Sequence, residues 1–385
     1  NLLLSSEGMK PHGMGFIVSR DEAKILRLGR RPGLETRILS YRNGRDLTGR
    51  LRDVMIIDMH GLSCDDVRHN FPEVYQWLLD RVKPERDHNN QKYRRENWWL
   101  FGGKNTELRA AIAALSRYIV TVKTAKHRFF TFLDKSVLPD SKLIIIASDN
   151  QSHLGVLSSR IHVVWSLVSG SHLGVGNDPT YVKSSSFEKF PFPIMSDIQA
   201  NSIAKLATSL DQHRKRQQQA HNELTLTDIY NILSKLRSGE SLTADERLIH
   251  EQGLVSVLKQ IHDDLDAAVF DAYGWPASLT DEEILTRLVA LNAERAAEEA
   301  RGVVRWLRPE FQNPTGQKAA SQGTLIEEAA DAPEEKTAKQ EKRPWPKTLP
   351  ERARAVKAAL AARRAPVTPE QLAKSFLRAR VEGVE

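Results

Sequence analysis

Cysteine is nearly absent from the sequence, since Cys64 is the only one among 385 residues. A single cysteine excludes internal disulfides and any zinc site built from several thiolates, and it is typical of a reducing cytoplasm. Apolar runs long enough to span a bilayer are absent as well. Residues 1–7 lack an initiating Met and the pattern of a signal peptide. We therefore expect a cytoplasmic protein with no membrane partner, and a chain that is a piece of a longer one.

Known catalytic motifs are also missing from the sequence. It contains no P-loop, dinucleotide glycine motif, G-x-S-x-G elbow or Asn-Pro-Pro motif. Pro139–Asp140 could begin a metal-dependent nuclease site, but the nearest Glu-x-Lys, at 334–336, falls in a segment expected to be a linker. His153, His162 and His172 lack the paired spacing of a metal site. We expect neither catalytic nor metal-binding residues in this chain, and any reacting groups would lie upstream of it.

Positive charge is what the sequence has in excess. The formal net charge is +7, and residues 71–130 alone hold twelve Lys and Arg against six Asp and Glu. The same segment contains Trp77, Trp98 and Trp99. Cations mixed with aromatic residues are typical of a surface that contacts phosphates and stacks on bases. The alternative is that Trp77 and one of the paired tryptophans lie in the core, with the arginines as a solvated rim.

Hydrophobic periodicity predicts an α+β fold with a mixed sheet. Short apolar runs predict strands at 16–18, 54–59, 119–124, 129–133, 143–147 and 163–167. Helices are expected after Ser19, from Pro72, after Asn105 as N-cap and after a capping box of Thr280 and Glu283, and they fill almost all of 196–307.

Composition divides the chain into five expected segments. Residues 313–342 have too few large apolar residues to fold and predict a disordered linker. Helical patterns at 350–363 and 368–381 predict part of a small module. The expected segments are a junction or the end of a preceding domain (1–20), a mixed-sheet domain (21–195), a helical domain (196–310), the linker (311–345) and a partial, winged-helix-like module (346–385).

Three loops carry cations suited to phosphate or base-edge contacts. Asn43–Gly44 predicts a tight turn flanked by Arg42 and Arg45. A later loop carries Lys126 and Arg128, and two serines precede Arg160. Ordinary exposed loop charge, or a helix start at Ser158, is the alternative in each case.

Short motifs follow one another in a fixed order, namely Glu7–Met9, Gly15–Ile17, Tyr41–Asp46, Phe71–Tyr75, Lys83–Arg86, Arg95–Trp99, Leu157–Arg160 and Phe187–Pro193. In this order they resemble the target-recognition region of large class I SAM-dependent adenine-specific DNA methyltransferases. These are the MmeI-like enzymes of type IIG restriction-modification and related phage-defence systems. Residues 262–276 and 279–309 resemble the helical region that follows in the same family.

The resemblance implies what this chain does and what it leaves to another domain. In the family, a Rossmann-like domain with a glycine-containing SAM motif and an Asn-Pro-Pro-Tyr motif precedes this region, and neither motif occurs here. The family methylates the exocyclic amine of adenine after flipping the base out of the duplex. We therefore expect S-adenosyl-L-methionine to bind the upstream methyltransferase domain of the same polypeptide. This chain would be the target-recognition domain that binds duplex DNA.

Combining charge pattern and resemblance gives a set of expected DNA contacts. They are Arg42, Arg45, Arg94, Arg95, Lys104, Lys126, Arg128 and Arg160, together with Trp98 and Trp99. The two tryptophans have two alternative roles, which are stacking on bases and packing helix 105–120 against the sheet. The alternative function is a basic helical scaffold that meets acidic protein partners and has no link to a methyltransferase.

Overall fold

A computed structural model of the chain describes residues 1–172, 178–316, 343–344 and 376–377. The described residues up to 316 belong to one compact unit. It is built on two four-stranded sheets, which confirms the α+β class. The mixed sheet has the order β2 (Ile17–Val18), β4 (Met55–Ile57), β3 (Ile38–Arg42), β7 (Val137–Pro139), with only the β3–β7 pair parallel. The antiparallel sheet has the order β1 (Ser5–Glu7), β8 (Leu143–Ile146), β5 (Arg117–Val122), β6 (Thr131–Asp134).

The antiparallel sheet is buried on both faces. In β8, Leu143 and Ile145 belong to the larger hydrophobic cluster, whereas Ile144 and Ile146 belong to a second one. Ile119 of β5 joins the second cluster, and its neighbours along the strand join the first. Because successive side chains point to opposite faces of a sheet, this division requires a covering layer on each side.

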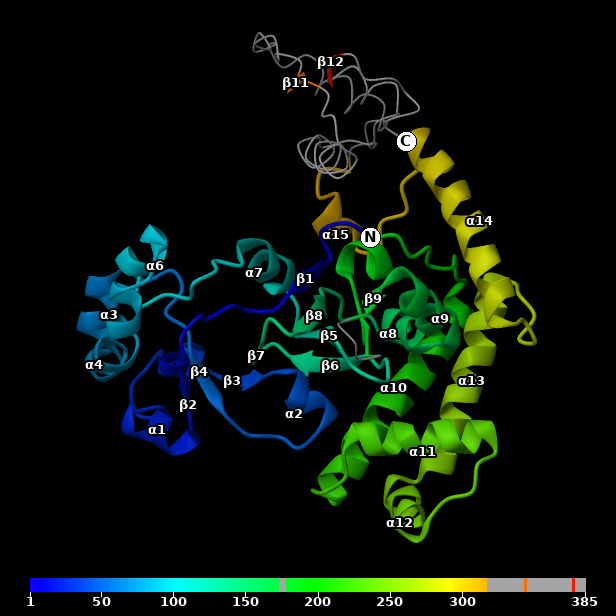
Figure 1. Cartoon of the computed structure of the whole chain (residues 1–385), viewed down its shortest axis with the longest axis horizontal. Helices are drawn as coiled ribbons and strands as arrows, with labels where there is room; N and C mark the ends of the chain where they lie inside the picture. The colour runs from blue at the N-terminus through cyan, green and yellow to red at the C-terminus, as the bar shows by residue number, and fades with distance from the viewer. Residues whose placement is uncertain (173–177, 317–342, 345–375, 378–385) are drawn as a thin grey trace. The chain divides into compact units, whose positions relative to one another are not determined.

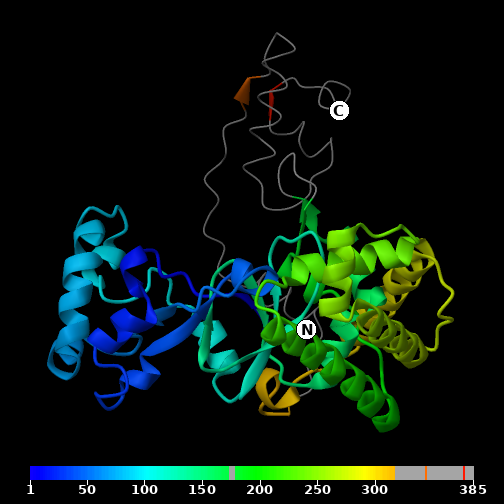
Figure 2. The same ribbon diagram turned by 90° about the horizontal axis from the view of Figure 1, so that it is seen from below.

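Residues 14–112 carry short helices before, between and after the first three strands of the mixed sheet. They are η1 (Met14–Phe16), α1 (Arg20–Ile25), η2 (Leu34–Thr36), α2 (Gly44–Thr48), α3 (Cys64–Asn70), α4 (Pro72–Arg81), α5 (Lys83–Asp87), α6 (Lys92–Glu96) and α7 (Thr106–Ile112). α4 begins at Pro72 as predicted and buries Val74 and Leu78. α1 also begins as predicted, with Ser19 and Glu22 forming a capping box. Figure 1 shows α1, α3, α4 and α6 gathered beside this sheet, and Figure 2 agrees.

Longer helices follow the last strand of the antiparallel sheet. The elements are α8 (Gln151–Ser158), α9 (Arg160–Ser169), β9 (Ser171–His172), β10 (Pro179–Thr180), η3 (Lys183–Phe187), α10 (Asp197–Ala220), α11 (Leu226–Ser238), α12 (Ala244–Gly253), α13 (Val255–Tyr273), α14 (Asp281–Ala300) and α15 (Pro309–Gln312). This confirms the predicted helical region, and the predicted capping box of Thr280 and Glu283 starts α14.

α10 joins these helices to the antiparallel sheet. Buried Arg214 donates to the carbonyl oxygen of Phe130 at 2.6 Å, and Thr131 donates to the Asp211 carboxylate at 2.6 Å. Ala207 packs in the second cluster with side chains of the sheet. The segments 21–195 and 196–310 therefore share their core.

Three local predictions were wrong. The apolar run 163–167, expected to be a strand, lies in α9, because a helix buried on most sides lacks the polar face that would reveal its period. Asn43–Gly44 forms no hairpin turn, since Asn43 caps α2 instead. Asn105 precedes α7 but makes no side-chain cap, and that helix ends at Ile112, before β5.

The predicted linker and terminal module lie almost wholly outside the described residues. Besides residues 311–316, the parts described there are β11 (Arg343–Pro344) and β12 (Phe376–Leu377), which pair in parallel, so two residues of the expected helix 368–381 are extended. Among the helices of the described ranges, none combines the length and apolar character needed to cross a membrane.

Buried histidines predict a loss of stability in acid. Burial lowers the pKa of His153 to about 4 and that of His162 to about 3. Below pH 6.5 the unfolded chain takes up a proton on each histidine, whereas the folded chain does not. The free energy of unfolding should therefore be intact above pH 6.5 and fall by about 1.4 kcal/mol per histidine per pH unit below it.

Urea denaturation of the wild type and of His162→Gln between pH 7.5 and pH 5 measures this effect. Glutamine does not titrate and can still accept a hydrogen bond from Tyr181, which His162 contacts at 3.0 Å. The variant should lose one histidine's share of the pH dependence. Burial raises the pKa of Asp266 to about 6, and this carboxyl acts in the opposite sense in both proteins, so it cancels in the comparison. Equal pH dependence in the two proteins would contradict the prediction.

Candidate nucleic-acid interface

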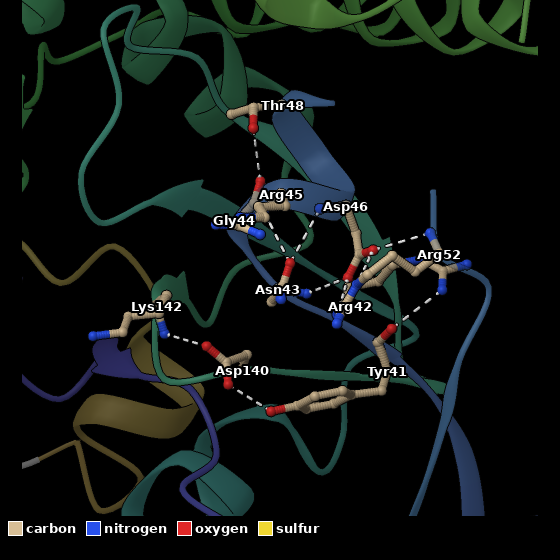
Figure 3. A network of polar contacts seen from close by, with 10 residues as sticks. All are labelled: Tyr41, Arg42, Asn43, Gly44, Arg45, Asp46, Thr48, Arg52, Asp140 and Lys142. Carbon is tan, nitrogen blue, oxygen red and sulfur yellow. Dashed lines mark hydrogen bonds and ion pairs between the residues drawn. The ribbon is translucent and has the colours of Figure 1, made fainter. Parts of the chain in front are cut away.

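The end of β3 and the start of α2 form a tightly bonded corner. The Asn43 side-chain oxygen accepts from the backbone N–H of Arg45 at 2.9 Å and of Asp46 at 3.2 Å. In return, the Asp46 carboxylate accepts from the Asn43 backbone N–H at 2.7 Å. This capping box, drawn in Figure 3, stabilises a helix of only five residues and fixes the backbone position of Arg45 at its start.

Asp46 is the buried acid of this corner and is paired with Arg52. The Arg52 guanidinium donates to it at 2.9 and 2.7 Å, and the Arg52 backbone N–H adds a third bond at 3.1 Å. Burial alone would raise the pKa of Asp46, but the bonds from Arg52 and Asn43 outweigh burial, and the pKa is lowered. Asp46 therefore stays ionised and neutralises Arg52.

Tyr41 and Asp140 tie this corner to the turn between β7 and β8. The Tyr41 hydroxyl donates to one Asp140 oxygen at 2.5 Å, and the other oxygen accepts from the Lys142 backbone N–H at 2.7 Å. The Asp140 N–H donates to the Arg42 carbonyl at 2.8 Å. Burial, together with the bond to Asp140, raises the pKa of Tyr41 far above its ordinary value, so the hydroxyl remains a donor.

Three cations near this turn are not neutralised. Arg45 and Lys142 are exposed and make no ion pair with any described residue. Arg42 is half-buried, and its guanidinium donates only to the carbonyl of Tyr41, at 3.2 Å. Burial lowers the pKa of Arg42, although Asp46 and Asp53 oppose that effect. Figure 3 labels all three around the Asp46 and Asp140 network.

Further lysines lie next to Lys142 at the end of β5. The Lys123 N–H donates to the Lys142 carbonyl at 2.8 Å, and its ammonium pairs with Glu7 at 2.5 Å. Glu7 also pairs with Lys10 at 2.6 Å, so one carboxylate serves two lysines. Lys126, three residues beyond Lys123, is exposed and donates to the neutral side chain of Asn231 at 2.7 Å.

Arg94 of α6 and Lys104, in the loop after Trp99, continue this group. A side chain at Gly102 would meet Arg94 Nε at 2.9 Å, and one at Gly103 would meet Lys10 Cβ at 3.5 Å. The exposed Lys104 ammonium lies 5.2 Å from the centre of the Tyr93 ring. We name the whole set the basic band, made of Lys10, Arg42, Arg45, Arg94, Lys104, Lys123, Lys126 and Lys142.

Three predicted contact residues are placed outside the basic band. Arg95 is exposed on α6 and donates to the Asn89 carbonyl at 2.7 Å. Arg160 begins α9 and pairs with Asp281 at 2.6 Å. Arg128 is buried, and its guanidinium donates to Thr121, Val122 and Pro179. Burial lowers the pKa of Arg128 to about 10, and the side chain holds β5 and β10 together instead of facing solvent.

The tandem tryptophans are packing residues in this structure. Trp98 is 7% exposed and meets the Tyr75 ring edge-on, with centroids 5.5 Å apart. Trp99 donates from Nε1 to the Leu62 carbonyl at 2.9 Å. Trp98 thus contacts α4 and shares the larger hydrophobic cluster with Leu108 and Ala111 of α7, and Trp99 is bonded to the loop before α3. The buried Trp98 indole offers no face on which a base could stack, whereas Trp99 is only partly buried.

Three members of the basic band were not singled out from the sequence. Lys10, Lys123 and Lys142 are far apart along the chain, and only the pairing of β1, β5 and β8 brings them together. No short motif marks them, so only a correct prediction of strand pairing could have found them.

Gly8 and Gly15, near the start of the chain, lie directly against backbone. A side chain at Gly8 would lie 2.2 Å from the Asp140 carbonyl oxygen, and one at Gly15 would lie 2.7 Å from that of Arg81. These glycines permit close backbone packing and leave no cradle for S-adenosyl-L-methionine, so that cofactor does not fit them. Within the described ranges, no three His, Cys, Asp or Glu residues are grouped to hold a metal ion.

Two Asp–Arg pairs of different burial predict different losses of stability. Asp46→Asn removes a fully buried carboxylate from Arg52 and should lower the free energy of unfolding by about 2 kcal/mol. Asp53→Asn breaks the exposed pair with Arg20 and should cost less than about 1 kcal/mol. Urea denaturation of both variants checks this difference, and equal losses would contradict it.

Comparison with known proteins gives a likeness of fold. No protein-family model and no curated protein sequence matches this chain. Among solved structures, it is similar to the type IIL restriction-modification enzyme MmeI in complex with DNA, with a TM-score of 0.58 and 18% identity. The match covers 76% of this chain but only 36% of the MmeI chain. At the level of fold, this agrees with the resemblance seen in the sequence: the chain is folded like one part of a restriction-modification enzyme.

Proposed function

We propose that this chain is the DNA-binding and sequence-recognition part of an adenine-specific, SAM-dependent DNA methyltransferase of a restriction-modification or phage-defence system. The observation that carries the proposal is the basic band, which gathers cations from five separate stretches of a chain folded like part of a DNA-bound enzyme. Arg45, Lys142, Lys104 and Lys126 are exposed, and none of them is neutralised by a carboxylate of the described residues. Phosphate contacts of this kind supply affinity and register, while neighbouring loops contact base edges.

Methyl transfer belongs, in this proposal, to another domain of the same polypeptide. That domain would bind S-adenosyl-L-methionine, since Gly8 and Gly15 at the start of this chain are packed against backbone. The fragment would then select the site in the cytoplasm of the host cell, and the upstream domain would act on the flipped adenine.

A basic scaffold that binds acidic proteins is the second candidate function. Its support is that carboxylates such as Glu7 and Asp46 already pair with cations of this chain. This support is weaker than the support that the exposed unpaired cations give to DNA binding. The two functions differ in whether duplex DNA is preferred over other polyanions.

Binding to duplex DNA should depend steeply on salt. The double variant Arg45→Ala, Lys142→Ala removes two phosphate contacts, so its plot of log affinity against log salt should be shallower by about two. The loss should be similar for every DNA sequence. Fluorescence anisotropy with labelled duplexes at several salt concentrations measures both quantities.

A matched control removes the same charge elsewhere. Lys24→Ala, Lys259→Ala takes away two lysines that pair with acids at 2.8 and 2.6 Å. It should bind DNA like the wild type. An affinity that ignores salt, or equal binding of heparin and duplex DNA, would exclude the proposed function in favour of the scaffold.

The chain alone should bind DNA without methylating it. Incubation with tritiated S-adenosyl-L-methionine and a duplex substrate should leave no label on the DNA, because the sequence has neither the glycine-containing SAM motif nor the Asn-Pro-Pro-Tyr motif. Label transferred to adenine would show that the methyl-transfer site lies within these residues.

A further inference from the structure

Arg86 is buried without an ion pair to any described residue, and unlike Arg128 it leaves two of its nitrogens without a hydrogen bond. Arg86 of α5 is only 1% exposed. Its Nη2 donates to the carbonyls of Pro11 at 2.7 Å and Leu100 at 3.4 Å, but Nε and Nη1 have no partner among the described residues. No carboxylate forms an ion pair with it. Burying an ionised group in this way is costly unless a counter-charge is supplied.

Two more cationic side chains lie beside Arg86. Arg94 packs over Gly102 with a buried Nε that has no partner, and its terminal nitrogens bond to no described residue. The His12 ring packs on the same glycine, where a side chain would lie 2.6 Å from Cδ2. Burial, then the charges of Arg94, Arg86 and Lys10, lower the pKa of His12, and Glu85 opposes them. Three nitrogen-bearing groups therefore converge with no ion pair to a described carboxylate, although the Glu85 carboxylate lies close to the same loop at Gly13.

The backbone around this cluster is held in an unusual conformation. His12 has φ +51° and Asn105 has φ +48°, which is the left-handed region that non-glycine residues rarely adopt. Hydrogen bonds from Gly102 to Pro11 and from Gly103 to Lys10 lock the two loops together. Outliers of this kind concentrate where a site must be held in a fixed geometry.

The side chains that surround the cluster identify its ligand. Arg94 presents unbonded guanidinium nitrogens, His12 can add a proton, and exposed Lys104 stands in the same loop. A guanidinium fork matches the geometry of a phosphate group, and unlike a buried protein carboxylate a phosphate can arrive from solvent. Arg86, which is buried, would supply a fixed positive charge from the interior of the protein.

We propose that His12, Arg86 and Arg94 form an anchor for a single phosphate group, and that this phosphate belongs to the backbone of duplex DNA. The identity of the phosphate rests on the proposed DNA-binding function. The anchor fixes one point of the basic band, so it sets the register of the chain on the duplex more than it sets total affinity.

The test uses the full chain with ¹³C-labelled histidine, so that His12 itself reports on the anion. Its signal is assigned by comparison with His12→Gln. Saturating duplex DNA should move the signal and raise the pKa of His12, because an added negative charge favours the imidazolium. Inorganic phosphate should move the same signal at higher concentration.

Neighbouring arginines give a matched pair of variants. Arg94→Gln and Arg95→Gln remove the same charge from α6, but Arg95 only donates to the Asn89 carbonyl. We expect Arg94→Gln to weaken DNA binding roughly tenfold and Arg95→Gln no more than about twofold, since only the first loses a charge-assisted fork. Thermal denaturation verifies that both variants are folded. The DNA titration of the His12 signal is made on the wild-type chain, so it tests the anchor even if a variant fails to fold.

The outcomes separate the anchor from the wider function. DNA that binds without changing His12, or equal losses in the two variants, would overturn the anchor while leaving DNA binding in place. A His12 signal that responds to inorganic phosphate when no duplex binds would instead overturn the proposed function and the assignment to DNA. A response to both ligands, lost in Arg94→Gln, is the expected result.

Discussion

The pairing of β5 with β8 is the contact on which the rest of this structure depends. The two strands are antiparallel along four residue pairs, from Ile119 and Ile146 to Val122 and Leu143. Their side chains alternate between two hydrophobic clusters, so neither face of the sheet can be left in water. The mixed sheet and its short helices cover one face, and α8 and α10 complete the core on the other. Both layers are packed onto the same few apolar residues.

A sheet buried on both faces has no room for charge along its strands. In the antiparallel sheet, Lys123 therefore lies after β5 and Lys142 before β8, and in the mixed sheet Arg42 stands at the end of β3. Strand pairing brings those ends to one place, which is how cations far apart in sequence form the basic band. The cores thus determine the position of the charges even though they contain few of them.

Local signals in the sequence predicted most of the helices and strands, but they could not predict which distant segments pair. The caps at Ser19 and Thr280 and the buried turns of α4 were visible because each depends on residues three or four apart. The 163–167 run was misassigned because an apolar β-branched stretch fits a buried helix and a strand equally well. Arg128 could not be placed from charge alone, since its three bonds come from chain segments that only the fold brings close. Lys10 and Lys142 were missed for the same reason.

The position of β1 has a consequence for how the protein is made. Leu4 is buried, and β1 pairs only with β8, a strand that begins at Leu143. During synthesis the first strand therefore leaves the ribosome long before its partner exists. It must wait as exposed chain until β5, β6 and β8 have assembled, and only then can it close the edge of the sheet. Within these residues, a strand that is translated early is thus among the last to pair.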